Sequence, residues 1–273
     1  MLRVGVPASS ANLGAAFDAV AVALGSHLEV GVGGDEEAAP ESHPAVRAFR
    51  HAGGSGPISV RAHFPGGRGL GFSGAARVGG ALAARVQQGE SVHEARHAVL
   101  ATATELEGHA DNAAASLLGG VVAVAGGRAV RVPVATELAI VVWIPDRETS
   151  TTGARRLLPE SVPFADAAFN VGRTALLVAA LARGDVAALR TATEDRLQQD
   201  RRLARVPETH QAIQAALDAG AYAAWLSGSG PSAAAFVDPA RAADIAAALP
   251  ASGRHAVLSI DDVGATVMTG ADS

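Results

Sequence analysis

The order of apolar and polar positions predicts strands in the first quarter of the chain. "LRVGVPA" and "AVAVALGSHLEVGV" are rich in Val, which predicts a strand followed by a second strand or a hairpin. Between them, "SSANLGAAFD" has the composition of a turn. The acidic segment 33–44 contains Gly and Pro and is expected to be an exposed loop, and "ISVRAHF" (58–64) then alternates as a strand does.

Helical spacing begins after this last strand, where the apolar positions Ala75, Val78, Leu82 and Val86 predict a first helix. A second helix is predicted over about 91–106, because Ser91 is followed three residues later by Glu94, the pattern of a capping box. Residues 107–120 begin with polar side chains and continue as a helix of small residues that Gly119 and Gly120 end.

The second half of the chain alternates in the same way. Three β-rich runs between residues 121 and 145 predict a meander or part of a mixed sheet, and "AYAAWLSGSGPSAAAFV" (221–237) reads as strand, glycine turn and strand. A helix and an edge strand near "HAVLSI" are expected to follow. Between the runs at 121–145 and the segment 221–237, helices are predicted over 164–183, 185–204 and 208–219. The mixture predicts an α+β protein of two lobes, residues 1–150 and 151–273.

Composition narrows the class of protein. The net charge is −5 and lysine is absent, so all 22 basic residues are arginine, and a nucleic-acid backbone is not the expected partner. No cysteine is present, which excludes thiolate metal sites and disulfides and fits a reducing compartment. No uninterrupted apolar run reaches the roughly 18 residues of a membrane span, and the N-terminus lacks the apolar core of a signal peptide. We expect a cytoplasmic protein without a membrane partner.

The first polar cluster is "PASSANLG" (7–14), followed by Asp18. An Asn side chain supplies two donors and an acceptor, and Asp18 supplies an anion. Together Asn12 and Asp18 are suited to an ammonium-and-hydroxyl substrate. An ordinary turn with side-chain caps is the alternative.

The second cluster is the glycine loop "GLGFSGA" (69–75), which lies between a predicted strand and a predicted helix. Backbone N–H groups of such a loop, together with a helix N-terminus, bind an anion without any side-chain charge. The absence of lysine excludes a Walker A loop, and the surrounding elements are not those of a Rossmann unit. A tight turn without a ligand remains the alternative.

The third cluster is "EGHADN" (107–112), at the start of the small-residue helix. Glu107 is a candidate Mg²⁺ ligand, because hard cations take carboxylate oxygens. His109, Asp111 and Asn112 are candidate substrate contacts. A helix N-cap with acidic residues is the alternative, and zinc is disfavoured because no second His follows at i+4.

The three clusters, in this order, resemble those of the GHMP kinase superfamily, and the chain is most similar to its homoserine kinases. "VPASSANLGAAFDAVAVAL" is similar to that family's N-terminal motif V-P-A-S-S-A-N-L-G-P-G-F-D, and "EGHADNAAASLLGG" resembles E-G-H-x-D-N-x-A-x-x-x-L-G-G. "TTGARRLLP" (151–159), "DRLQQDRR" (195–202) and "WLSGSGPSAAAF" resemble its later motifs. The resemblance extends from residue 4 to about 237.

The resemblance implies a two-lobed GHMP-kinase-like fold, with an N-terminal mixed α/β lobe and a C-terminal α/β sandwich lobe. It implies transfer of the γ-phosphoryl group of ATP to the side-chain hydroxyl of L-homoserine, giving O-phospho-L-homoserine in threonine biosynthesis, with ATP and Mg²⁺ as cofactors. It also suggests a homodimer, which nothing in the residues themselves shows.

Site residues follow from the resemblance by position. Ser73 and Glu107 would bind the metal ion. The residues expected around the ATP phosphates are Gly69, Leu70, Gly71, Phe72, Ser73, Gly74 and Ala75. Those expected around the acceptor are Asn12, Asp18, His109, Asp111, Arg155, Arg202, Gly228 and Gly230, with both arginines on its carboxylate. Those expected next to the reacting groups are Asn112, Thr151 and Arg155.

The chain departs from the family pattern at several of these positions. Ala15 and Ala16 replace Pro-Gly beside the expected acceptor pocket, Phe72 replaces the first serine of the phosphate loop, and Gly74 replaces an alanine. In the helical segment the family's His, Pro and aromatic residues are replaced by Gln198, Asp200 and Arg201.

Two other functions therefore stay open: a GHMP-type kinase for a different alcohol, and a catalytically impaired relative that binds an amino acid. Single residues also have alternatives. Arg155 is next to Arg156 and can be a surface residue, and Arg202 belongs to an arginine-rich segment in which a solvated face is the default. Asp18 can act as a base or only bind the substrate.

Overall fold

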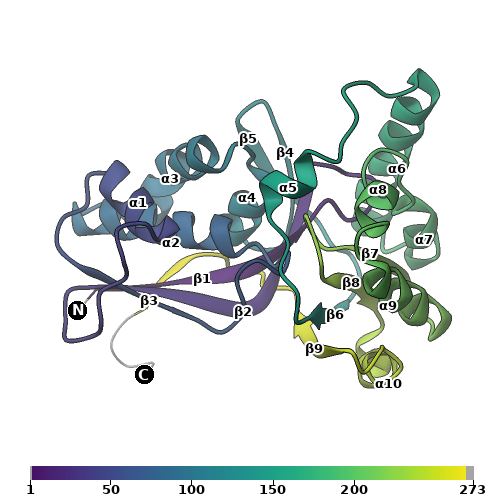
Figure 1. Ribbon diagram of the computed structural model, residues 1–273. Coiled ribbons are helices and arrows are strands. Elements are labelled where there is room, and N and C mark those ends of the chain that lie inside the picture. The colour runs from purple at the N-terminus through teal and green to yellow at the C-terminus, as the bar shows by residue number, and fades with distance from the viewer. Residues whose placement is uncertain (1, 269–273) are drawn as a thin grey trace.

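The computed structural model describes residues 2–268, which form two lobes side by side (Figure 1). Their strands are β1 Leu2–Ala11, β2 Val20–Val32, β3 Ile58–Ala62, β4 Val121–Ala125, β5 Arg128–Val132, β6 Ala139–Pro145, β7 Ala223–Leu226, β8 Ala233–Val237, β9 Gly253–Ser259 and β10 Thr266–Met268. The first lobe holds a sheet of order β10-β1-β2-β4-β5, in which β3 also pairs with β2. The second holds a sheet of order β7-β8-β6-β9.

Helices cover one face of the first sheet (Figure 1). They are α1 Pro44–His51, α2 Phe72–Gln87, α3 Val92–Glu107 and α4 Asp111–Leu118. The small side chains of α2 are buried against the sheet, where Val6, Leu28 and Val30 meet Val78 and Leu82 in one core. Burial of this face holds the N-terminus of α2, and with it the glycine loop, over the end of β1.

The second lobe is a sandwich in which both faces of its sheet are covered. Its helices are α5 Thr151–Arg155, α6 Phe164–Arg183, α7 Leu189–Ala192, α8 Gln199–Leu203, α9 Pro207–Asp218 and α10 Ala242–Ala247. Alternation along β6 produces the two faces: Val141 and Trp143 pack with residues of α9 and α10, whereas Ile140 and Val142 join the core that includes the first lobe. This shared core fixes the two lobes against each other.

Helix α6 is the one described helix that by length and composition alone is sufficiently apolar to cross a membrane. One of its faces packs into the protein, with Leu177 and Leu181 in the main core and the Asn170 side chain donating to the carbonyl of Ala15 at 2.9 Å. Its other face leaves Phe164 and Val171 exposed.

Several predicted elements are confirmed. The capping box at Ser91 is present, because the Ser91 hydroxyl accepts from the Glu94 N–H and the Glu94 carboxylate accepts from the Ser91 N–H. The helix predicted over 164–183 has those bounds as α6, and the strand–turn–strand over 221–237 is the β7–β8 pair. Residues 20–32, for which a strand or a hairpin was possible, form the single strand β2.

The helix predicted over 185–204 is wrong. The chain forms a short 3-10 turn, α7, an irregular segment and then α8. The break has a local cause: the Thr193 hydroxyl donates to the carbonyls of Leu189 and Arg190, and the Asp195 carboxylate caps the N–H of Gln198 at 2.8 Å, which begins a new helix.

The three runs predicted over 121–145 to form a meander or part of a mixed sheet do not share one sheet: β4 and β5 pair antiparallel in the first sheet, whereas β6 leaves it and pairs antiparallel with β8 and β9 of the second. Strand β10, which no sequence pattern predicted, returns from the second lobe to pair with β1. The two sheets therefore do not divide at residue 150. Helix α1 was missed as well, although Pro44 in its first turn is a typical start signal; its N-cap is His43, whose side chain accepts from the Ala45 N–H.

Candidate active site

The second and third polar clusters come together at one cleft of about 210 Å³, and Asn12 and Asp18 of the first cluster lie next to its lining residues Gly228 and His109. Its walls are formed by Gly67, Gly69, Gly71, Phe72, Ser73, Gly74, Glu107, His109, Asn112, Thr149, Thr151, Gly228, Ser229 and Gly230. A larger hollow of about 820 Å³ lies next to Arg131 and Asp262, and none of the predicted site residues lines it. The cleft is thus the place where elements from both lobes present the predicted chemistry.

The glycine loop is fixed in shape by contacts to its backbone. The Leu70 carbonyl accepts from the Ser9 N–H at 3.1 Å, and the Gly69 carbonyl accepts from the Ser227 hydroxyl at 2.6 Å. Gly71 is the N-cap of α2 in the left-handed region, with φ +69°, and no side chain caps the helix there. The first N–H groups of a 16-residue helix are therefore left for an anion.

Two members of the predicted loop contribute only through their backbone. The side chains of Leu70 and Ala75 are buried in the core and do not line the cleft. Their burial anchors the loop rather than forming its surface.

Gly71→Ala is expected to lower the free energy of unfolding by about 1–3 kcal/mol, because positive φ and a steric conflict act together. A Cβ at this position would lie 2.0 Å from the Ser9 hydroxyl oxygen. Urea unfolding measures the effect. Gly33→Ala is the matched control, since Gly33 has φ +72° and no neighbour within 4 Å. Equal losses in the two variants would show that the close packing at Gly71 contributes nothing.

Phe72 packs into an aromatic corner. Its ring meets Phe64 edge-on at 6.0 Å and His43 edge-on at 5.9 Å between centroids. A Cβ on Gly66 would also lie in contact with the ring, at 3.5 Å. The residue that departs from the family's serine therefore forms an apolar wall of the cleft.

Phe72→Ser is expected to destabilise the fold by about 1–3 kcal/mol, because the edge-on aromatic contacts and part of the buried ring are lost. Thermal or urea unfolding measures the change. Val263→Ser is the control, since Val263 is 66% exposed and its replacement should have almost no effect. The same small change in both variants would contradict a packing role for Phe72.

Ser73 and Glu107 form an oxygen pair that fits a divalent cation. The Ser73 hydroxyl donates to Glu107 Oε2 at 2.8 Å, and the Glu107 side chain is only 9% exposed. Oxygens at this separation match neighbouring corners of a Mg²⁺ octahedron, which are about 3 Å apart. Arg77 contacts both groups, as an ion pair with Glu107 and a hydrogen bond to Ser73.

The third cluster is not a helix cap, contrary to the alternative for it. Glu107 is the last residue of α3, Gly108 turns the chain with φ +84°, and α4 begins at Asp111. Its N-cap is Ala110, which offers no side-chain cap. Glu107, His109 and Asn112 thus line the cleft, while Asp111 lies in the first turn of α4 and its carboxylate accepts from the Asn112 N–H at 2.8 Å.

His109 lies between the two carboxylates of this cluster. Its Nδ1 is 2.7 Å from Asp111 Oδ1, while its buried Nε2 is 3.7 Å from Glu107 Oε1 and has no hydrogen-bond partner among the described residues. Asp18 approaches from the other side, so that one ligand atom each of Asp18, His109 and Asp111 lie within 4.8 Å of one another. An orphaned ring nitrogen beside two acids is a ready contact for a polar ligand.

The guanidinium groups of Arg155 and Arg202 both lie near the aromatic ring of Phe17, next to this cluster. The guanidinium carbons of Arg155 and Arg202 are 5.4 and 5.2 Å from the ring centroid of Phe17. Arg155 donates to Asp18 Oδ1 at 2.7 Å, and Gln198 accepts from Arg202 at 2.9 Å. Two cations held this closely provide a place for a carboxylate.

Arg202 is not on a solvated face, since it is 3% exposed. Burial, followed by repulsion from Arg155, lowers the pKa of Arg202 to about 10. Its Nε has no hydrogen-bond partner among the described residues. A buried, incompletely paired guanidinium would gain from an anionic ligand.

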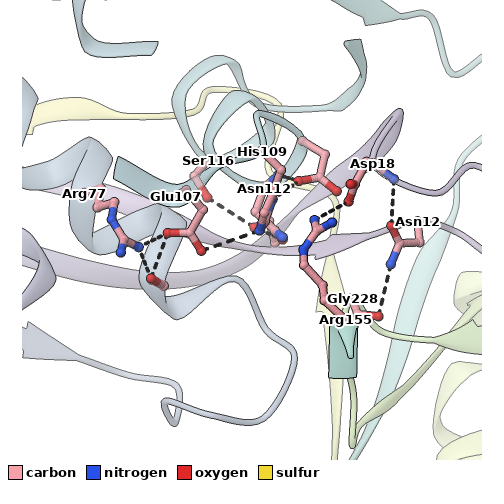
Figure 2. A network of polar contacts seen from close by, with 12 residues as sticks. Asn12, Asp18, Arg77, Glu107, His109, Asn112, Ser116, Arg155 and Gly228 are labelled. Carbon is pink, nitrogen blue, oxygen red and sulfur yellow. Dashed lines mark hydrogen bonds and ion pairs between the residues drawn. The ribbon is translucent and has the colours of Figure 1, made fainter. Parts of the chain in front are cut away.

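Asn12 joins the first cluster to the glycine turn of the second lobe. Its Oδ1 accepts from the Asp18 N–H at 3.0 Å and its Nδ2 donates to the Gly228 carbonyl at 3.0 Å (Figure 2). Both ends of the amide are therefore used inside the protein. Asn112 likewise accepts from the Ser9 hydroxyl at 2.9 Å. These hydrogen bonds hold the side chains of Asn12 and Asn112 in place and connect the elements that form the site.

Sequence reasoning missed several residues of the site. Arg77 carried a signal, since it lies four residues after Ser73 among the small apolar residues of the first half of α2. Ser9 and Ser10 interrupt the apolar strand β1 and are fully buried in contacts between loops. Phe17 and Gln198 carried no signal beyond lying in quoted motifs.

Comparison with known proteins agrees with this geometry. The models of the GHMP kinases N terminal domain and the GHMP kinases C terminal domain match residues 42–120 and 177–255. The homoserine kinase of Streptomyces avermitilis is 42% identical, covering 98% of this chain and 95% of the relative, and a homoserine kinase of Thermus thermophilus is 38% identical, covering 95% and 96%.

Solved structures show the same relationship. A homoserine kinase from Cytophaga hutchinsonii superimposes with a TM-score of 0.84 at 25% identity, covering 98% of this chain and 97% of that one. A mevalonate kinase from L. major, solved with R-mevalonate, shares the fold with a TM-score of 0.67 at 16% identity, covering 95% of each chain. With both family models and relatives along its whole length, the chain belongs to the GHMP kinase family.

Proposed function

We propose that this protein transfers the γ-phosphoryl group of ATP to the side-chain hydroxyl of L-homoserine, giving O-phospho-L-homoserine and ADP. The observation that carries the proposal is the pairing of Arg155 and Arg202 on one ring beside Asp18. This arrangement is suited to the carboxylate and ammonium groups of an amino acid. The glycine loop lies in the adjoining cleft, and relatives with 36–42% identity are named homoserine kinases.

In this proposal the residues of the loop and of the third cluster hold the nucleotide. The loop from Gly69 to Ala75 binds the phosphates through the N–H groups that precede Ala75, whose own N–H donates to the Gly71 carbonyl at 2.9 Å. Ser73 and Glu107 are the protein ligands of Mg²⁺. When bound, Mg²⁺ neutralises phosphate charge that would otherwise oppose transfer. Glu107 is well suited to this role because it is buried next to the loop.

The acceptor is held at its two charged ends. Arg155 and Arg202 bind its carboxylate, while Asp111 and Asp18, which also pairs with Arg155, attract its ammonium group. The side-chain hydroxyl is then directed toward Asn112 and Thr151. Phosphoryl transfer depends mainly on positioning and charge neutralisation, so no strong base is needed.

A panel of acceptors at fixed Mg²⁺ and ATP tests the choice of substrate. We expect ADP release with L-homoserine that exceeds release with mevalonate, sugars and other hydroxy amino acids. Turnover of another alcohol with none of L-homoserine would favour a different kinase of this family, for which Ala15 and Ala16 beside the acceptor pocket are the motivating feature.

Calorimetry with Mg-ATP separates the kinase from a catalytically impaired amino-acid-binding relative. A kinase should bind both the nucleotide and L-homoserine. Binding of L-homoserine alone, without heat on nucleotide addition, would support the impaired relative, for which Phe72 in the loop is the motivating departure.

We also propose that the enzyme acts in the cytoplasm as a homodimer, without a nucleic-acid or membrane partner. The net charge of −5 supports the absence of a nucleic-acid partner. The exposed Phe164 and Val171 on α6 are a candidate contact for the second subunit.

A further inference from the structure

The guanidinium of Arg77 lies next to Ser73 and Glu107, the two proposed ligands of the metal ion. One nitrogen, Nη1, contacts both Glu107 Oε2 and the Ser73 hydroxyl oxygen. Figure 2 shows Arg77 next to Glu107. The Ser73 hydroxyl in turn donates to the same Oε2 at 2.8 Å. Arg77 therefore binds the same two side chains that are proposed to ligate Mg²⁺.

Arg77 reaches these groups from the body of helix α2 rather than from the cleft. It lies one turn after Ser73, and residues on either side of it, Ala76 and Val78, are fully buried in the core. Its own side chain is 15% exposed. Burial, and then repulsion from Arg47, lowers the pKa of Arg77, as expected for a cation that is poorly hydrated.

The lone pairs of the oxygen pair are largely taken in this arrangement. Glu107 Oε2 accepts a hydrogen bond from the Ser73 hydroxyl and forms an ion pair with Arg77. The Ser73 oxygen itself accepts a hydrogen bond from Arg77. A divalent cation on these atoms would meet a unit positive charge within a few ångströms, in surroundings that screen charge poorly. The two cations oppose each other at a single carboxylate.

We propose that Arg77 is the counter-ion of Glu107 in the metal-free protein and competes with Mg²⁺ for it, which sets the metal affinity of the enzyme. In the absence of metal, Arg77 neutralises a buried carboxylate. When metal binds, Arg77 must give up Oε2 and the Ser73 oxygen. The inference rests on the proposed metal site, and it concerns affinity rather than the reaction itself.

The test is Mn²⁺ binding to the full-length protein with saturating ADP, followed by the electron paramagnetic resonance signal of free Mn²⁺. Arg77→Met is expected to bind Mn²⁺ about tenfold more tightly than the unmodified protein, because the opposing charge is gone. Arg85→Met is the matched control: it removes a guanidinium from the same helix, one that pairs with Glu90 at 3.1 Å. The control should leave Mn²⁺ affinity unchanged.

Thermal unfolding gives a second readout that needs no nucleotide. In EDTA, Arg77→Met should melt at a lower temperature because Glu107 is buried without a partner, and the double variant Arg77→Met/Glu107→Gln should recover part of that loss. The double variant also provides a folded protein if the single one is too unstable to study.

The outcomes separate this inference from the proposed function. Loss of Mn²⁺ binding in Glu107→Gln together with unchanged or weaker binding in Arg77→Met overturns the counter-ion role and leaves the metal site intact. Unchanged Mn²⁺ binding in Glu107→Gln instead removes the metal site on which both rest. A double variant that melts no higher than Arg77→Met also overturns the counter-ion role.

Discussion

Glu107→Gln is expected to lower kcat by at least about a hundredfold with a smaller change in the KM for L-homoserine, because an anionic metal ligand becomes neutral. The substitution keeps the shape of the side chain, so the Ser73 hydrogen bond at 2.8 Å can be retained. Steady-state ADP release at saturating Mg²⁺ measures it.

Glu105→Gln is the matched control for this prediction. Glu105 lies two residues earlier on α3, is largely exposed and pairs with His51 at 3.5 Å. Its replacement should leave kcat within about twofold, as expected for a surface ion pair. If Glu107→Gln behaves like this control, Glu107 is not a metal ligand in catalysis.

Arg202→Met is expected to raise the KM for L-homoserine by a factor of between about 30 and several thousand. This range corresponds to about 2–5 kcal/mol for a buried charge pair. The physical reason is that Arg202 is buried, with a pKa lowered to about 10, and its Nε lacks a partner among the described residues. An acceptor carboxylate would supply that partner.

The measurement is a comparison of KM for the two substrates. The KM for ATP should change little, because Arg202 does not line the glycine-loop cleft. Arg201→Met is the control, since Arg201 is adjacent in sequence and exposed. An unchanged KM for L-homoserine in Arg202→Met would remove this residue from the acceptor pocket.

The parts of the site that depend on local backbone chemistry were predictable from the sequence. The glycine loop followed by a helix is observed, and Gly71 adopts the positive φ that glycine tolerates. Glu107, His109 and Asn112 reach the cleft from the predicted polar cluster.

The parts that depend on packing between elements were not predictable. Periodicity identified β6 as a strand but carried no information on which sheet it would join. Arg77 falls among small apolar residues of α2, and only the approach of α3 brings Glu107 next to it. Arg202 belongs to an arginine-rich segment that is typical of a surface, and the break between α7 and α8 turns it inward.

The most direct test of the proposed function is ³¹P NMR of the products formed from Mg²⁺, ATP and L-homoserine. We predict that ADP and a phosphomonoester appear in equal amounts, with the phosphorus coupled to the side-chain CH₂ protons next to the former hydroxyl. Omission of L-homoserine should abolish both signals. Release of inorganic phosphate alone, or no consumption of ATP with L-homoserine present, would contradict the assignment of this protein as a kinase of that hydroxyl.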